Sequence, residues 1–109
     1  YTPDEVRKMR HLGMDHRFPR GESMNDVAER MHRWLHGVTV VAQKYRWNSV
    51  VAVTHDVAIT CLLHQLFNLD RRTTWLHKID HTSITTIERV GEDWCLICFN
   101  ATPHLSPEW

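Results

Sequence analysis

The sequence predicts an α/β layered fold, and the order of its helix and strand patterns is the basis for that prediction. Val50–Val53 is a short, mostly β-branched run of the kind found in strands that are buried on both faces. Apolar residues then recur at every third or fourth position over Val57–Leu69, which indicates a helix. A longer helical pattern precedes the strand and a hairpin pattern follows the helix, so we expect helices layered against a sheet.

Two helices are predicted ahead of the strand. Thr2 as N-cap and Pro3 at the first helical position begin a short helix, which ends by Gly13. Ser23 as N-cap, with Asp26 reaching back to it, begins a second helix of about 20 residues. The apolar face of this second helix has helical spacing and consists of Met24, Val27, Met31, Trp34, Leu35, Val38, Val41, Ala42 and Tyr45.

The carboxyl-terminal part of the chain predicts a β-hairpin. Thr82–Val90 and Trp94–Phe99 are its strands, and Gly91–Asp93 is the turn between them. We expect Asp70–Asp80 to be irregular and residues 106–109 to be a disordered tail. The apolar anchors expected in the irregular segment are Trp75, Leu76 and Ile79.

The length of the chain suits a single domain over residues 1–109. Its 13 Lys and Arg residues balance 13 Asp and Glu residues and are scattered, so no nucleic-acid partner is expected. No apolar run approaches the roughly 20 residues of a membrane span, so no membrane partner is expected either. Three cysteines, an odd number, argue against a disulfide framework and favour a reducing, cytoplasmic location.

Two pairs of residues are spaced like metal ligands, but neither predicts a metal site. Cys95 and Cys98 stand three apart in a predicted strand, where such positions point to opposite faces. His32 and His36 share a helix face, but no glutamate stands beside the first histidine to act as a base. We therefore expect no metal and no cofactor.

The junction between the predicted strand and its helix is the best candidate for a functional site. At such a junction the free backbone N–H groups and the helix dipole favour an anion. His55 lies there, and its imidazole can hold a phosphate and change charge near neutral pH. From the residue pattern alone, a catalytic histidine and a hydrogen-bonded structural histidine fit equally well.

The loop before the second helix is cationic. Arg17 and Arg20 could form the rim of a site for an anionic substrate, or they could belong to a solvated connection. Glu22 could supply an acid, but we favour a role in starting or orienting the helix.

Four motifs in register resemble the histidine phosphatase superfamily, which is phosphoglycerate-mutase-like. They are R-F-P-R-G-E-S at Arg17–Ser23, V-V-A-V-T-H-D-V-A-I at Val50–Ile59, T-S-I-T-T-I-E at Thr82–Glu88 and N-A-T-P-H-L at Asn100–Leu105. The chain is most similar to the carboxyl-terminal half of such a protein. The resemblance implies a three-layer αβα fold, of which this chain would be an incomplete portion.

The resemblance also implies a chemistry, the hydrolysis of phosphate monoesters through a phosphohistidine intermediate. His55 takes the place of the second pocket histidine, and the backbone N–H of Asp56 adds a donor to the phosphoryl group. The carboxylate of Asp56 should point away from a bound dianion. The nucleophile belongs to an R-H-G motif expected upstream of Tyr1, and Arg10–Gly13 does not replace it because it follows a helical segment.

Two alternatives stay open beside the phosphatase. One is a non-catalytic pseudophosphatase or protein-interaction module, and the other is a phosphoglycerate mutase-type phosphotransferase. The expected partner is a small phosphorylated substrate. An unpaired sheet edge beside Val50–Val53 would also favour a homo-oligomer or a complementing amino-terminal fragment.

Overall fold

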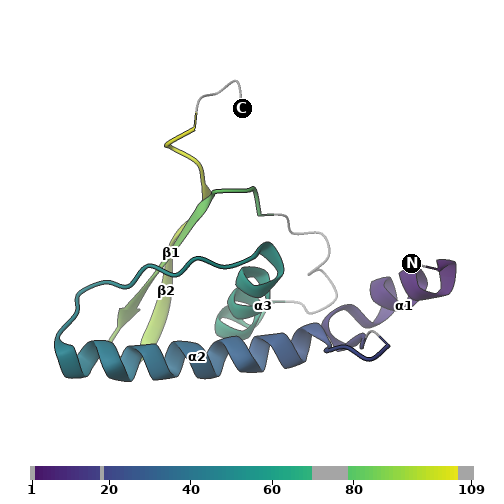
Figure 1. Ribbon diagram of the computed structural model, residues 1–109, viewed down its shortest axis with the longest axis horizontal. Helices are drawn as coiled ribbons and strands as arrows, with labels where there is room; N and C mark the ends of the chain where they lie inside the picture. Colours follow the sequence, from purple (N-terminus) through teal and green to yellow (C-terminus); the bar gives the residue numbers. More distant parts are fainter. Residues whose placement is uncertain (1, 18, 70–78, 106–109) are drawn as a thin grey trace. The chain divides into compact units, whose positions relative to one another are not determined.

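The computed structural model describes residues 2–17, 19–69 and 79–105 (Figure 1). The chain divides into two compact units, residues 1–77 and residues 78–109. The first unit contains the three α-helices, and the second contains a two-stranded sheet. This mixture of helices with a small sheet is compatible with the predicted α/β class.

The first helix, α1, spans Pro3–Leu12 and follows the predicted signals. The hydroxyl oxygen of Thr2 accepts a hydrogen bond from the backbone N–H of Glu5 at 3.1 Å, which confirms the N-cap. Gly13 ends the helix with a φ of 56°, a conformation that glycine adopts without a steric penalty. A short 3₁₀ turn, η1, continues over Gly13–Asp15.

The second helix, α2, spans Met24–Tyr45 and is 22 residues long, which confirms the predicted start and length. Its capping box is complete. The backbone N–H of Asp26 donates to the hydroxyl of Ser23 at 3.2 Å, and the N–H of Ser23 donates to the Asp26 carboxylate at 2.9 Å. Arg46, with a left-handed φ of 57°, ends the helix.

The third helix, α3, spans Asp56–Phe67 and packs against α2. It begins one residue earlier and ends two residues earlier than the apolar pattern predicted, because Asn68 turns left-handed with a φ of 51°. The core between the helices is small. Its buried residues are Met14, Met24, Ala28 and Cys61, with Val27 packed against them.

The prediction of a buried strand at Val50–Val53 is wrong for this structure. The segment has no regular secondary structure, and Val51 and Val53 are 90% and 98% exposed. The physical reason is that a strand exists only through its neighbours. None of the described residues pairs with this segment, so its β-branched side chains have no sheet to enter.

The predicted hairpin is confirmed in the second unit. Strand β1, Ile84–Val90, pairs antiparallel with β2, Asp93–Ala101, and Val90 stands opposite Asp93 at the turn. The register shifts opposite the step from Thr86 to Ile87, which indicates a bulge in the facing part of β2. A bulge breaks the regular alternation of side chains between the two faces of a strand. The expectation that Cys95 and Cys98 point to opposite faces therefore does not hold.

Some expectations lie outside the described residues. These are the structure of residues 70–78, including the anchors Trp75 and Leu76, and the tail at residues 106–109. Ile79, the third expected anchor, is buried. Within the described ranges, the helices are too short or too polar to cross a membrane.

Candidate active site

His55 is the residue immediately before the first turn of α3, and its side chain is exposed. Its backbone is extended, with φ of −119° and ψ of 156°, and its carbonyl accepts the first helical hydrogen bond from Ile59 at 3.1 Å. The imidazole makes no capping bond to the helix. The ring is therefore accessible beside the positive end of the helix dipole, where the N–H groups of the first turn have no side-chain cap.

Asp56 is the first residue of α3 and lies at the same helix end. Its carboxylate accepts a hydrogen bond from the hydroxyl of Thr60, one turn further along, at 3.3 Å. Because Thr60 is buried, this bond directs the carboxylate along the side of the helix. The backbone N–H of Asp56 belongs to the set that projects from the helix N-terminus.

Arg17 is held at the start of α2. Its guanidinium contacts the Asp26 carboxylate at 2.6 Å and donates to the carbonyl of Gly21 at 3.1 Å, and its backbone bridges Ser23. The backbone hydrogen bond from Ser23 is the main cause that lowers the pKa of Asp26, and the charge of Arg17 lowers it further. Arg17 thus completes a capping network around the first turn of α2.

Glu22 and Arg20 complete this loop. The Glu22 carboxylate contacts the guanidinium of Arg30, on α2, at 2.9 Å. Arg20 is exposed and adopts a left-handed φ of 61°. Both loop residues are on the surface, but only Glu22 has an ion-pair partner among the described residues.

The structure gathers the predicted site residues into two groups. His55 and Asp56 lie together at the start of α3, whereas Arg17, Arg20 and Glu22 lie together before α2. Within residues 2–17, 19–69 and 79–105, no hydrogen bond or ion pair joins the two groups. The Arg17 loop therefore acts on α2 and does not reach His55 through a direct contact.

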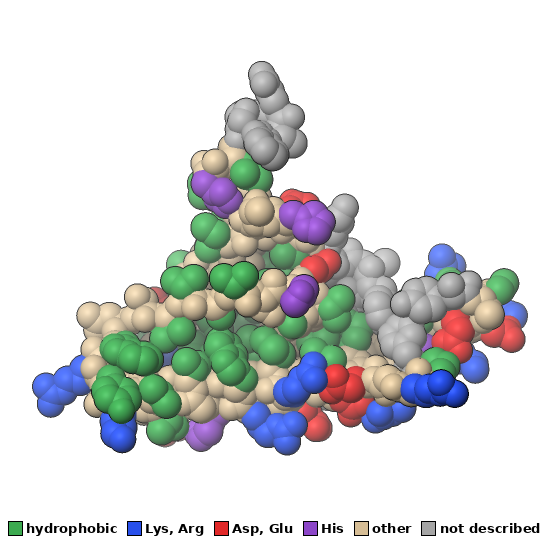
Figure 2. Space-filling model, viewed as in Figure 1, with side chains coloured by type: hydrophobic (Ala, Val, Ile, Leu, Met, Phe, Trp, Pro, Cys, Tyr) green, Lys and Arg blue, Asp and Glu red, His purple; other side chains and the backbone are tan. Residues whose placement is uncertain are grey.

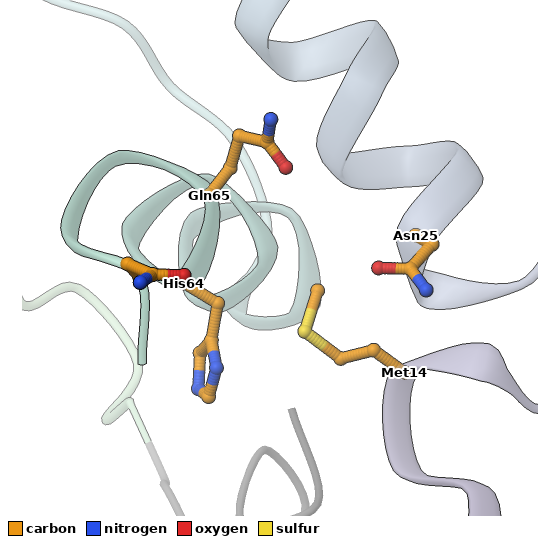
Figure 3. A pocket seen from close by; sticks show the side chains of 5 residues that line it. Met14, Asn25, His64 and Gln65 are labelled. Carbon is orange, nitrogen blue, oxygen red and sulfur yellow. The ribbon is translucent and has the colours of Figure 1, made fainter. Parts of the chain in front are cut away.

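A cavity of about 120 Å³ lies elsewhere in the first unit, between η1, α2 and the far end of α3. Met14 and Asn25 extend toward α3, which carries His64 and Gln65 (Figure 3). Asn68 completes the described lining. The hollow has room for a few water molecules, so it is too small and too far along α3 to be the anion cavity that we expected beside His55.

Two histidines are buried that the sequence did not single out. His64 faces this cavity, and His16 lies 3.1 Å from a Glu5 carboxylate oxygen that reaches over from α1. The spacing of His64, four residues after buried Thr60 and three after buried Cys61, was the signal that places it on the inner face of α3. His16 carried no comparable periodic signal.

The described residues contain no group of three or more His, Cys, Asp or Glu side chains placed to hold a metal ion. All three thiols are free, with Cys61 in the core and Cys95 exposed on β2. Burial raises the pKa of the Cys61 thiol to about 11, so this thiol is a packing group and a poor nucleophile.

Comparison with known proteins identifies the family of the chain. The family model of the histidine phosphatase superfamily, branch 1, matches residues 1–102. The chain therefore belongs to the histidine phosphatase superfamily, whose members include phosphatases and mutases. No curated protein matches the chain.

Proposed function

We propose that the chain belongs to a metal-independent phosphatase that cleaves phosphate monoesters through a phosphohistidine, with His55 as the second pocket histidine. Its position carries this proposal, since His55 is an exposed imidazole at the N-terminus of a 12-residue helix. The family membership supports a function of the phosphatase or mutase type, and we choose the phosphatase. The complete domain would have the three-layer αβα fold, and this chain would be an incomplete portion of it.

The helix end explains what His55 would do. In phosphoryl transfer, negative charge lies on the three equatorial oxygens while the bond to the leaving group loosens. An imidazolium and the N–H groups of Asp56 and Val57 can counter that charge without moving. The hydrogen bond from Thr60 holds the Asp56 carboxylate along the helix, which lessens its repulsion of the substrate.

The nucleophile would come from an R-H-G motif outside this chain. Arg10–Gly13 cannot take that role, because Arg10 to Leu12 are helical and exposed on α1 and Gly13 begins η1. A nucleophile needs rigid placement beside its phosphate partners. The chain alone is therefore expected to be inactive, and a complementing amino-terminal segment would restore the site.

Reconstitution tests this proposal. The polypeptide encoded upstream is expressed with the chain, and hydrolysis of a generic aryl phosphate is measured with a metal chelator present. We expect hydrolysis from the mixture and none from either part. Acid-labile and alkali-stable radioactive phosphate on the upstream part would mark the phosphohistidine. An active pair that forms no phosphoenzyme would contradict the mechanism.

A non-catalytic module is the second candidate, and the Arg17 loop favours it. Arg17 is ion-paired to Asp26 on α2, so it is not free to take an anionic substrate without breaking that contact. A pseudophosphatase would keep this contact and bind a partner protein. A mutase is less well supported, because Asp56 and Val57 follow His55 where the mutase branch of the family typically has Gly and Asn.

We also propose a cytoplasmic location, and the cysteines support it. Three free cysteines suit a reducing compartment such as the cytoplasm.

The substrate that we propose is a small phosphorylated metabolite. Arg20, which is exposed in the loop before α2, would supply a cation at the rim of the substrate site.

A further inference from the structure

Two of the three thiols of the chain lie on one strand of the second unit. Figure 2 shows charged side chains over α1 and α2 of the first unit, whereas the reactive groups of β2 are the thiols of Cys95 and Cys98. Cys95 is exposed and Cys98 is half-buried. A regular strand would place them on opposite faces, and for that reason the sequence predicts no metal site there.

The register of the hairpin brings the two thiols to one face. Cys95 stands opposite Glu88, and Cys98 stands opposite Thr86, because the bulge takes up one extra residue of β2. Directly opposite residues share a face, and Thr86 and Glu88 share one because they are two apart on β1. Both are exposed, whereas Ile87 between them is half-buried. Cys95 and Cys98 therefore point to the same, more exposed side of the hairpin.

We propose that Cys95 and Cys98 form a two-thiolate site for a soft monovalent cation, Cu(I). Thiolate sulfur is a ligand that selects Cu(I), and two such ligands satisfy this ion. Two thiols and one Cu(I) give a bis-thiolate complex of one negative charge and two released protons, so binding weakens as the pH falls. The site is separate from the phosphatase reaction, which uses no metal.

The spacing of the two thiols fits a bridging ion better than a disulfide. Residues two apart on a strand have Cα atoms separated by roughly 6.6 Å. Thr86 and Glu88 set a similar spacing for the two cysteines across the ladder. A disulfide needs Cα atoms about 4.4–6.8 Å apart, so a direct S–S bond would lie at the upper limit of that range. An ion held between the two sulfur atoms spans a wider gap.

The neighbouring side chains favour a two-coordinate ion over zinc. A structural Zn²⁺ site takes four ligands, and the part of the chain that the structure describes places no third His, Cys, Asp or Glu side chain with these thiols to hold a metal. The hydroxyl of Thr86, across the ladder from Cys98, can donate a hydrogen bond to its thiolate. The carboxylate of Glu88, across from Cys95, favours the approach of a cation.

Competition with a Cu(I)-specific chelator tests the proposal. The reduced 109-residue chain is titrated with Cu(I) without oxygen, in the presence of bathocuproine disulfonate, and its mass is measured under native conditions. We expect one Cu(I) per chain. Cys95→Ser and Cys98→Ser should each raise the dissociation constant at least about 100-fold, because each removes the gain from linking two ligands.

C95S/L96C is the matched control. Leu96 stands opposite Ile87, so its side chain lies on the other face from Cys98. In a regular strand positions two apart share a face, and this C-x-C pair would then bind Cu(I) well. With the bulge, the folded variant should bind no better than Cys95→Ser, and it should gain affinity in urea, where no strand fixes the two faces. Amide hydrogen exchange in β1 and β2 shows whether the hairpin is intact.

Several results would overturn the proposal. They are loss of all Cu(I) to the chelator, Cys95→Ser or Cys98→Ser chains that bind as tightly as the parent, a folded C95S/L96C chain that does so, one Cu(I) shared by two chains, or displacement of Cu(I) by an equal amount of Zn²⁺. Phosphate hydrolysis is not a readout here, so failure of the phosphatase proposal would leave these outcomes unchanged.

Discussion

Replacing Ser23 by alanine removes the side-chain cap of α2, the longest helix of the chain. The hydroxyl of Ser23 accepts the backbone N–H of Asp26 at 3.2 Å, and Ser23 is buried, so water does not easily replace the lost bond. The second bond of the capping box, from the N–H of Ser23 to the Asp26 carboxylate at 2.9 Å, uses the backbone of Ser23 and survives.

The expected loss of stability is about 1 kcal/mol, the middle of the range of roughly 0.5–2 kcal/mol for N-cap deletions. For a unit of 77 residues, this corresponds to a fall in melting temperature of about 4–8 °C. Urea denaturation followed by far-ultraviolet circular dichroism measures it, since the loss appears as a lower midpoint at unchanged slope.

Two variants provide the comparison. Ser23→Asp keeps an N-cap acceptor and should stay within a few tenths of a kcal/mol of the parent chain. Ser49→Ala changes an exposed serine outside the helices and should have no effect. A Ser23→Ala variant as stable as Ser49→Ala would refute the view that this capping box determines where α2 begins.

Three further predictions follow from the core and the titratable groups. Met14→Ala, at a fully buried core position, should lower the unfolding free energy by about 2–5 kcal/mol. Val40→Ala, on the exposed side of α2, should change it little. Equal effects of the two variants in urea denaturation would contradict the assignment of Met14 to the core. Because the pKa of Asp26 is lowered from its ordinary value of 3.8, its ionised form stabilises the folded chain above that value, and this stabilisation should disappear as the pH falls through the folded-state pKa. Asp26→Asn should reduce this loss of stability at acid pH, measured as the unfolding free energy against pH. An equal loss in the variant and the parent chain would contradict the role given to Asp26. With its pKa raised to about 11, Cys61 should resist alkylation at mildly alkaline pH until urea is added, whereas Cys95 reacts at once; mass spectrometry that finds Cys61 labelled first would contradict its burial.

Local signals made the helices predictable. The caps at Thr2 and Ser23 and the periodic apolar residues of α2 act within a few residues of one another, so a single sequence contains the whole cause. The hairpin was predictable for the same reason, because its turn and both strands are adjacent in the chain. The position of His55 before α3 followed from the start of the helical pattern alone, because the strand predicted ahead of it is absent.

Structure that depends on pairing between distant residues could not be predicted from the sequence. The β-branched character of Val50–Val53 describes a preference, but a strand forms only where another strand supplies hydrogen bonds, and no described residue does so. The ion pairs of the loop before α2 could not be predicted for the same reason. Nothing in the order of residues reveals that Arg17 pairs with Asp26 or Glu22 with Arg30, because these contacts depend on how the loop folds back on α2.

The role of His55 is the central claim, and the rate of phosphate release by the reconstituted protein tests it most directly. His55→Ala, compared with His36→Ala on the exposed face of α2 as the control, should lower the rate constant by about 10²–10³, the usual effect of removing one group that stabilises transition-state charge. Circular dichroism should show both variants equally folded, since His55 is exposed and makes no capping bond. Equal rates from the His55→Ala and His36→Ala proteins would contradict the account.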